Sequence, residues 1–105
     1  MAWLYLFSAG ILEVIWAFTM KQSDGFSRPG PTAITIVTMI GSFALLSLAM
    51  RSLPLGTAYT IWTGIGAVGA FLVGVTVLGE ALTPMRIAAA ALIVSGLVMM
   101  KLSAS

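Results

Sequence analysis

The sequence predicts an all-α membrane protein with four transmembrane helices. Of its 105 residues, 60% are hydrophobic and only 8% are charged, and the mean hydropathy is +1.11. An average soluble domain is about 25% charged. The apolar residues form four stretches, each close to the about 20 residues that a helix needs to cross a hydrocarbon core. We therefore expect a single four-helix domain over residues 1–105, with no soluble domain.

The first two spans are bounded by polar and helix-breaking residues. The first, residues 2–20, ends at Lys21, and its apolar run has neither the basic start nor the cleavage-like site of a secretory signal, so we expect it to be retained. The second, residues 32–50, follows the breaker cluster at residues 29–31 and ends at Arg51.

The third and fourth spans are separated by a short polar connection. The third, residues 55–78, begins after Pro54, and the fourth, residues 85–100, ends at Lys101. Connections this short force neighbouring helices to run antiparallel. The prediction is an up-down-up-down bundle with both termini on one side of the membrane.

The basic residues are divided almost evenly between the two sides of the membrane. Arg51 and Lys101 lie on the side of the termini, and Lys21, Arg28 and Arg86 lie on the opposite side. Orientation normally follows an excess of Lys and Arg in cytoplasmic loops. A difference of one residue predicts dual topology, in which single copies insert either way round; the alternative is that one orientation dominates. The isolated cations form no polybasic cluster, so we expect no nucleic-acid partner.

The composition excludes several kinds of chemistry. The chain has no Cys and no His, which removes disulfides, thiolate or imidazole metal sites and cysteine nucleophiles. No plausible pairing of nucleophile and base is present either. We expect a protein that is not an enzyme and that needs no metal or cofactor.

Glu13 is the only acidic residue inside any of the four spans. A charged side chain at the bilayer centre costs about 2.5–3.5 kcal/mol, and such residues usually mark a pathway for ions, protons or substrate. Gly10 precedes Glu13 by one helical turn and Trp16 follows it by one turn, on the same face. Ser42 lies at a similar depth on the second span. Its hydroxyl is expected to donate either to Glu13 or to its own backbone one turn earlier.

The third span combines aromatic residues with a glycine cluster. Tyr59 and Trp62 are three residues apart, and position alone leaves Tyr59 as either a pocket residue or part of an interfacial aromatic belt. A carboxylate flanked by aromatic rings predicts a cationic substrate, and a planar guanidinium would also make two parallel hydrogen bonds with it. Gly64, Gly66 and Gly69 indicate a close backbone approach or a bend.

The fourth span carries small residues on one face. Ala88, Leu92 and Gly96 share that face and Ser95 lies beside it, a spacing that favours close helix packing in lipid. Four short helices cannot easily enclose a polar cavity, and one carboxylate cannot hold a cation on several sides. We therefore expect oligomerisation through this face; the alternative is that its small residues pack within one bundle.

Two motifs carry a resemblance to a known family. The segments GILEVIWA at residues 10–17 and LPLGTAYTIWTGIGAVG at residues 53–69, together with Lys21, resemble the small multidrug resistance family, most closely its guanidinium exporter subtype. The resemblance covers the whole chain. It implies an antiparallel, dual-topology homodimer in the bacterial inner membrane, surrounded by lipid, which exports guanidinium and small guanidinyl cations in exchange for protons by alternating access.

The resemblance also implies roles for particular residues. Protons and cation would compete for Glu13, within a site formed by Gly10, Glu13, Trp16, Ser42, Tyr59 and Trp62. The conformational hinge would be formed by Gly64, Gly66 and Gly69, and the dimer would pack through Ala88, Leu92, Ser95 and Gly96. The fourth-span face, often rich in glycine in this family, is mostly alanine in this chain.

Two other functions remain open from the sequence. The first is export of bulky quaternary ammonium compounds by a transporter of the same family, which would use the same acid and aromatic residues. The second is a non-transporting accessory subunit, in which Glu13 pairs with a cation of a partner protein.

Overall fold

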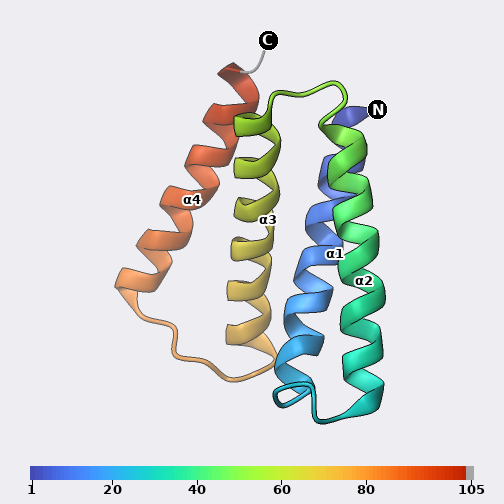
Figure 1. The fold of residues 1–105 in the computed structure, drawn as a ribbon. Helices are drawn as coiled ribbons and strands as arrows, with labels where there is room; N and C mark the ends of the chain where they lie inside the picture. The colour runs from blue at the N-terminus through green and yellow to red at the C-terminus, as the bar shows by residue number, and fades with distance from the viewer. Residues whose placement is uncertain (104–105) are drawn as a thin grey trace.

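Four long α-helices make up most of the chain. The computed structural model describes residues 1–103, in which α1 (Ala2–Gln22), α2 (Pro29–Ala49), α3 (Leu55–Thr76) and α4 (Pro84–Ser103) run alternately up and down (Figure 1). Each helix is long and apolar enough to cross a membrane. The start of α1 and the end of α4 lie at the same end of the bundle (Figure 1). The predicted all-α fold with four membrane-spanning helices is confirmed.

Proline lies at the start of three of these helices. α2 begins at Pro29, three residues before the expected start at residue 32, and its N-cap residue Arg28 has extended backbone. A proline is tolerated in the first turn because the N–H that it lacks would have no helical partner there. Pro54 is the N-cap of α3, and Pro84 is the first residue of α4. The breaker cluster before the second span is thus the first turn of that helix.

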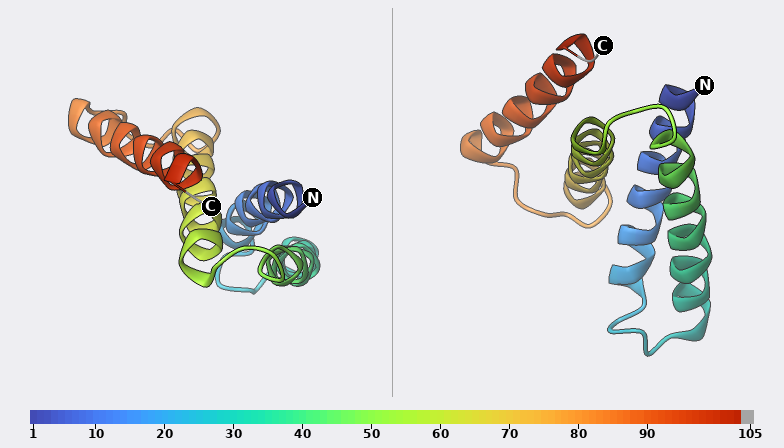
Figure 2. Two further views of the ribbon diagram at one scale, coloured as in Figure 1. Left: turned by 90° about the horizontal axis from the view of Figure 1, so that it is seen from above. Right: turned by 45° about the horizontal axis from the view of Figure 1, so that its top comes forward.

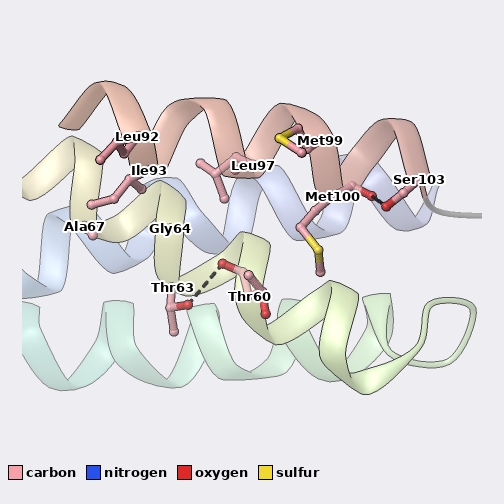
Figure 3. Close-up of a pocket in the computed structure, with 11 residues that line it drawn as sticks. Thr60, Thr63, Gly64, Ala67, Leu92, Ile93, Leu97, Met99, Met100 and Ser103 are labelled. Atoms are coloured by element: carbon pink, nitrogen blue, oxygen red, sulfur yellow. Dashed lines mark hydrogen bonds between the residues drawn. The ribbon is translucent and has the colours of Figure 1, made fainter. Parts of the chain in front are cut away.

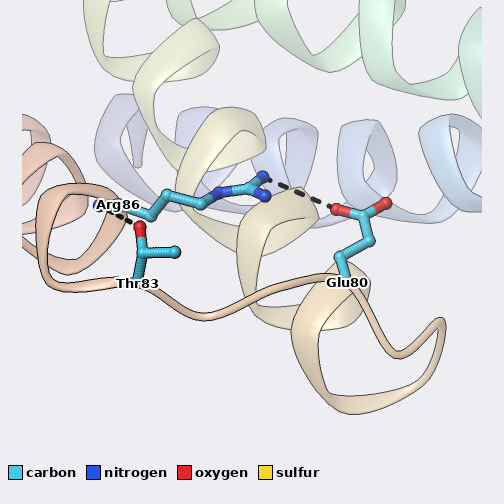
Figure 4. A network of polar contacts seen from close by, with 3 residues as sticks. All are labelled: Glu80, Thr83 and Arg86. Carbon is cyan, nitrogen blue, oxygen red and sulfur yellow. Dashed lines mark hydrogen bonds and ion pairs between the residues drawn. The ribbon is translucent and has the colours of Figure 1, made fainter.

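The connection between α3 and α4 is held by polar contacts. The hydroxyl of Thr83, immediately before α4, accepts a hydrogen bond from the backbone N–H of Arg86 (3.2 Å), as an N-cap residue does (Figure 4). The Arg86 guanidinium also lies 3.8 Å from the carboxylate of Glu80, and both side chains are exposed. Exposed pairs contribute at most about 1 kcal/mol. This contact therefore orients the connection more than it stabilises the fold.

The buried residues of the core come from the first three helices, and Leu97 and Met100 of α4 pack against them. α1 lies against both α2 and α3, whereas the backbone of α4 comes close to that of α3 alone. The buried apolar side chains come from α1, α2 and α3: Leu6, Ala9, Leu46, Ala49, Ala58, Ile61 and Trp62. Figure 2 shows α4 diverging from α1 and α2. Within the described chain no residue of α4 is buried, so most of the surface of this helix is uncovered.

Polar and small residues bring α1 close to its two neighbours. The hydroxyls of Thr19 on α1 and Thr35 on α2 are hydrogen-bonded to each other at 2.7 Å. On the other side, Gly10 of α1 lies so close to Ile65 of α3 that a Cβ atom at Gly10 would be only 2.6 Å from a methyl group of Ile65. These two contacts hold α1 close to both α2 and α3.

Candidate functional site

Glu13 lies in the middle of α1, with its carboxylate against the backbone of α3. A Cβ atom at Gly66 would overlap the carboxyl carbon and Oε1 of Glu13, so any larger residue at this position would force the acid to move. Oε1 of Glu13 is buried and has no hydrogen-bond partner within residues 1–103. An ionised carboxylate oxygen accepts hydrogen bonds, and leaving a buried one unpaired is costly. This oxygen is therefore poised to take a proton or a donor from a ligand.

Ser42 joins the three core helices through two hydrogen bonds. Its hydroxyl donates to the carbonyl of Ala9 on α1 (2.7 Å) and accepts from the indole Nε1–H of Trp62 on α3 (3.0 Å). The structure shows neither bond expected from the sequence, since Ser42 contacts neither Glu13 nor its own backbone in this way. A helical carbonyl has a second lone pair, and the antiparallel packing of α1 against α2 brings that of Ala9 within reach. Ser42 thus holds the Trp62 ring in place.

Four aromatic rings form a continuous row across α1, α2 and α3. Ring centroids are 6.4 Å apart between Trp16 and Phe43, 5.8 Å between Phe43 and Trp62, and 5.5 Å between Trp62 and Tyr59. These separations are typical of favourable aromatic pairs. Trp62 is buried, whereas Phe43 and Tyr59 are about half exposed. We call these four residues the aromatic row.

Phe43 was not identified from the sequence. It follows Ser42 directly and lies at the depth of Glu13, which was the only available signal. A phenylalanine in an apolar span normally faces lipid or core, so the residue type did not indicate that Phe43 lies near the candidate site. In the structure it connects Trp16 to Trp62. Tyr59, which the sequence left as either a belt or a pocket residue, packs on Trp62 at the end of the row.

Trp16 adds an unpaired donor near the acid. Its indole Nε1 is buried and has no hydrogen-bond partner within residues 1–103. Trp16 and Glu13 are one turn apart on the same helix, so one face of α1 presents an unpaired donor beside an unpaired acceptor. No cluster of three or more His, Cys, Asp or Glu residues that could hold a metal ion is found in that part of the chain.

The three glycines in the middle of α3 each lie against a side chain of a neighbouring helix. A Cβ atom at Gly64 would overlap Leu97 of α4, and one at Gly69 would overlap Val14 of α1. Gly66 lies between them and contacts the acid as described. α3 is continuous through all three positions. Of the two interpretations of this cluster, the structure therefore shows the close approach, and the hinge stays a prediction.

The proposed dimer face of α4 is uncovered in the single chain. Ala88, Leu92, Ser95 and Gly96 are all exposed, and a Cβ atom at Gly96 would meet no other atom within 4 Å. A groove of about 690 Å³ runs between α3 and α4 beside this face, with Thr63, Gly64, Ala67 and Leu92 along it (Figure 3). The small residues Ala88, Ser95 and Gly96 of α4 are therefore not buried within the subunit. Their role in a dimer remains a prediction.

Comparison with known proteins identifies the family. Residues 1–93 match the family model described as Small Multidrug Resistance protein. The chain belongs to the small multidrug resistance family. Similar members include a protein of Escherichia coli K12 named "Guanidinium exporter", which is 56% identical over 103 residues and 98% of each chain. Proteins of the same name from Salmonella typhimurium LT2 and Citrobacter freundii are 55% identical over 99% of each chain and 53% identical over 98% of each chain.

Proposed function

We propose that this protein exports guanidinium and small guanidinyl cations across the bacterial inner membrane in exchange for protons. The observation that carries the proposal is the similarity, over nearly the whole length, to relatives named guanidinium exporters at 53–56% identity. The four apolar helices support a multi-pass membrane protein. The geometry around Glu13 supplies the chemistry that such a transporter needs.

Glu13 is the group that binds the cation. Its unpaired Oε1 accepts hydrogen bonds, and a planar guanidinium offers two parallel N–H donors with the spacing of a carboxylate. The aromatic row presents ring faces to a cation, and weakly hydrated guanidinium groups bind such faces well. Trp62 is fixed by its bond to Ser42, so this part of the site is formed before substrate arrives.

Competition for the same carboxylate couples the two fluxes. A protonated carboxyl group has lost the charge and one of the acceptor positions that the cation requires, so proton and cation exclude one another at Glu13. No ion pair of Glu13 is found within residues 1–103, so no internal cation replaces either ligand. If the site opens alternately to each side, inward proton movement drives the cation outward.

The functional unit that we propose is an antiparallel homodimer. Glu13 lines none of four grooves found between the helices of residues 1–103, and a second copy would supply the other walls of a substrate chamber. The exposed small-residue face of α4 suits close packing in lipid. The nearly even distribution of Lys and Arg favours insertion in both orientations.

Transport by purified protein in proteoliposomes tests the proposal. With a proton gradient imposed, the wild type should accumulate guanidinium without any partner protein, and an excess of a bulky quaternary ammonium ion should compete poorly. Glu13→Gln should abolish both guanidinium binding and coupled uptake. Glu80→Gln is the matched control, because Glu80 is an exposed carboxylate outside the helices. Coupled transport by Glu13→Gln would refute the role of this acid, and a requirement for a second protein would indicate an accessory subunit.

A further inference from the structure

A second groove, which Glu13 does not line, lies between α1, α3 and α4. Its volume is about 580 Å³ and its walls are almost entirely apolar. The side chains along it include Trp3 and Phe7 of α1, Ile65 of α3, and Val98 and Lys101 of α4. Trp3 lies at the start of α1, and Ile65 faces Gly10. At 1.5 Å per residue, the groove descends roughly 10 Å from the membrane surface toward the centre.

The lining of this groove differs from that of the groove beside the proposed dimer face. More than half of the residues that line the α3–α4 groove are Gly, Ala, Ser or Thr: Thr60, Thr63, Gly64, Ala67, Gly96 and Ser103. The second groove contains none of these residue types. Helices associate in lipid through small residues that allow close approach of their backbones. Bulky, branched walls instead suit a flexible hydrocarbon chain, so a second copy is the natural occupant of the first groove and not of this one.

Lys101 is the one basic side chain among the described residues that line the second groove. The ammonium of Lys101 lies 5.4 Å from the ring centre of Trp3, so it bridges α4 and α1 at the end of the bundle that carries the termini. Trp at this depth is typical of the lipid headgroup level, and Lys side chains near helix ends reach the same level. The other basic residue at this end is Arg51, while Asp24 and Glu80 lie in connections at the opposite end. No Asp or Glu side chain competes for Lys101 there.

From this juxtaposition we propose that the groove is a binding site for one anionic phospholipid. An acyl chain occupies the apolar walls, and the headgroup phosphate pairs with Lys101. The cation–π contact with Trp3 holds the ammonium at the mouth before the lipid arrives. This site does not include Glu13, and lipid binding there does not depend on the proposed transport function.

Native mass spectrometry of the full-length protein tests this proposal. The protein is equilibrated with equal amounts of phosphatidylglycerol and phosphatidylcholine that carry the same acyl chains, and the bound copies of each are counted. An interfacial Lys contributes enough attraction to an anionic lipid for Lys101→Gln to lower the ratio of bound phosphatidylglycerol to phosphatidylcholine about five-fold. Lys101→Arg should keep the ratio. Arg51→Gln is the matched control, because it removes the same charge at the same end without touching the groove.

A second variant tests the apolar walls. Val98→Trp places a large ring in the groove and should displace lipid of both kinds, while circular dichroism shows unchanged helix content. An unchanged lipid ratio in Lys101→Gln, or an equal fall in Arg51→Gln, would overturn the proposal. A fall in the proportion of dimer in Val98→Trp, with bound lipid unchanged, would show that a second copy covers this groove and would also overturn it.

Discussion

Gly66→Ala is the substitution whose effect follows most directly from the packing of α1 against α3. The added methyl group would overlap the carboxyl carbon and Oε1 of Glu13, so the acid must leave its position or the two helices must separate. Forcing an extra methyl group into a packed interface typically costs about 1–3 kcal/mol. If Glu13 binds the cation from its present position, this penalty lowers guanidinium affinity about 5- to 150-fold.

The measurement is guanidinium binding by titration calorimetry, followed by coupled uptake into proteoliposomes. Gly56→Ala is the matched control, because it lies in the same helix and a Cβ atom there would meet nothing within 4 Å. Both substitutions replace glycine by a better helix former, so a general effect on helix stability would appear in both. A shorter acid should also tolerate the methyl group better, so the loss caused by Gly66→Ala should shrink in a Glu13→Asp background. Equal affinities of Gly66→Ala and Gly56→Ala would refute the reasoning.

Three further predictions address coupling, stability and assembly. Guanidinium affinity should weaken as pH falls, by at most about tenfold per pH unit for each competing proton, and calorimetry that finds the same affinity across the pH range would contradict competition at Glu13. Ser42→Ala should lower the free energy of unfolding by about 1–2 kcal/mol, because it leaves the buried Trp62 indole N–H without its acceptor. Thermal unfolding checks this, with Ser47→Ala as control because Ser47 is exposed. Equal melting temperatures of the two variants would argue against the hydrogen-bond network of Ser42. Gly96→Leu should leave the helix content of a subunit intact but reduce dimer recovered by cross-linking, since the position is open within the chain; undiminished cross-linking would remove α4 from the interface.

The existence and order of the helices followed from the sequence because each apolar stretch has the length of a membrane span and ends at a charge, a proline or a glycine. The start of α2 did not, because a proline cluster that breaks a helix internally is accepted in a first turn. The sequence pattern also did not predict that α4 diverges from α1 and α2. In lipid every face of a helix is apolar, so periodicity does not separate a surface facing lipid from one facing a neighbour.

The composition of the candidate site could be predicted only in part. Glu13 is exceptional as an acid inside a span, and the neighbouring aromatic residues of α1 and α3 have regular spacing relative to the helix turn. The partners of Ser42 depend on how α1 and α2 are rotated about their axes, which the sequence does not specify. From the sequence, Gly66 indicated either a close backbone approach or a bend. The position of the Glu13 carboxylate against the Gly66 backbone shows the close approach.

The separation of α4 from the three-helix core has a consequence for how related transporters diversify. In the proposed dimer, substitutions on the outward faces of α4 would alter which chains recognise one another without disturbing the proposed substrate site, whose residues belong to α1, α2 and α3. Duplicated copies of such a gene can therefore acquire exclusive pairing preferences while retaining a shared chemistry. Conversely, substitutions around Glu13 that change the cargo would leave such an α4 interface intact.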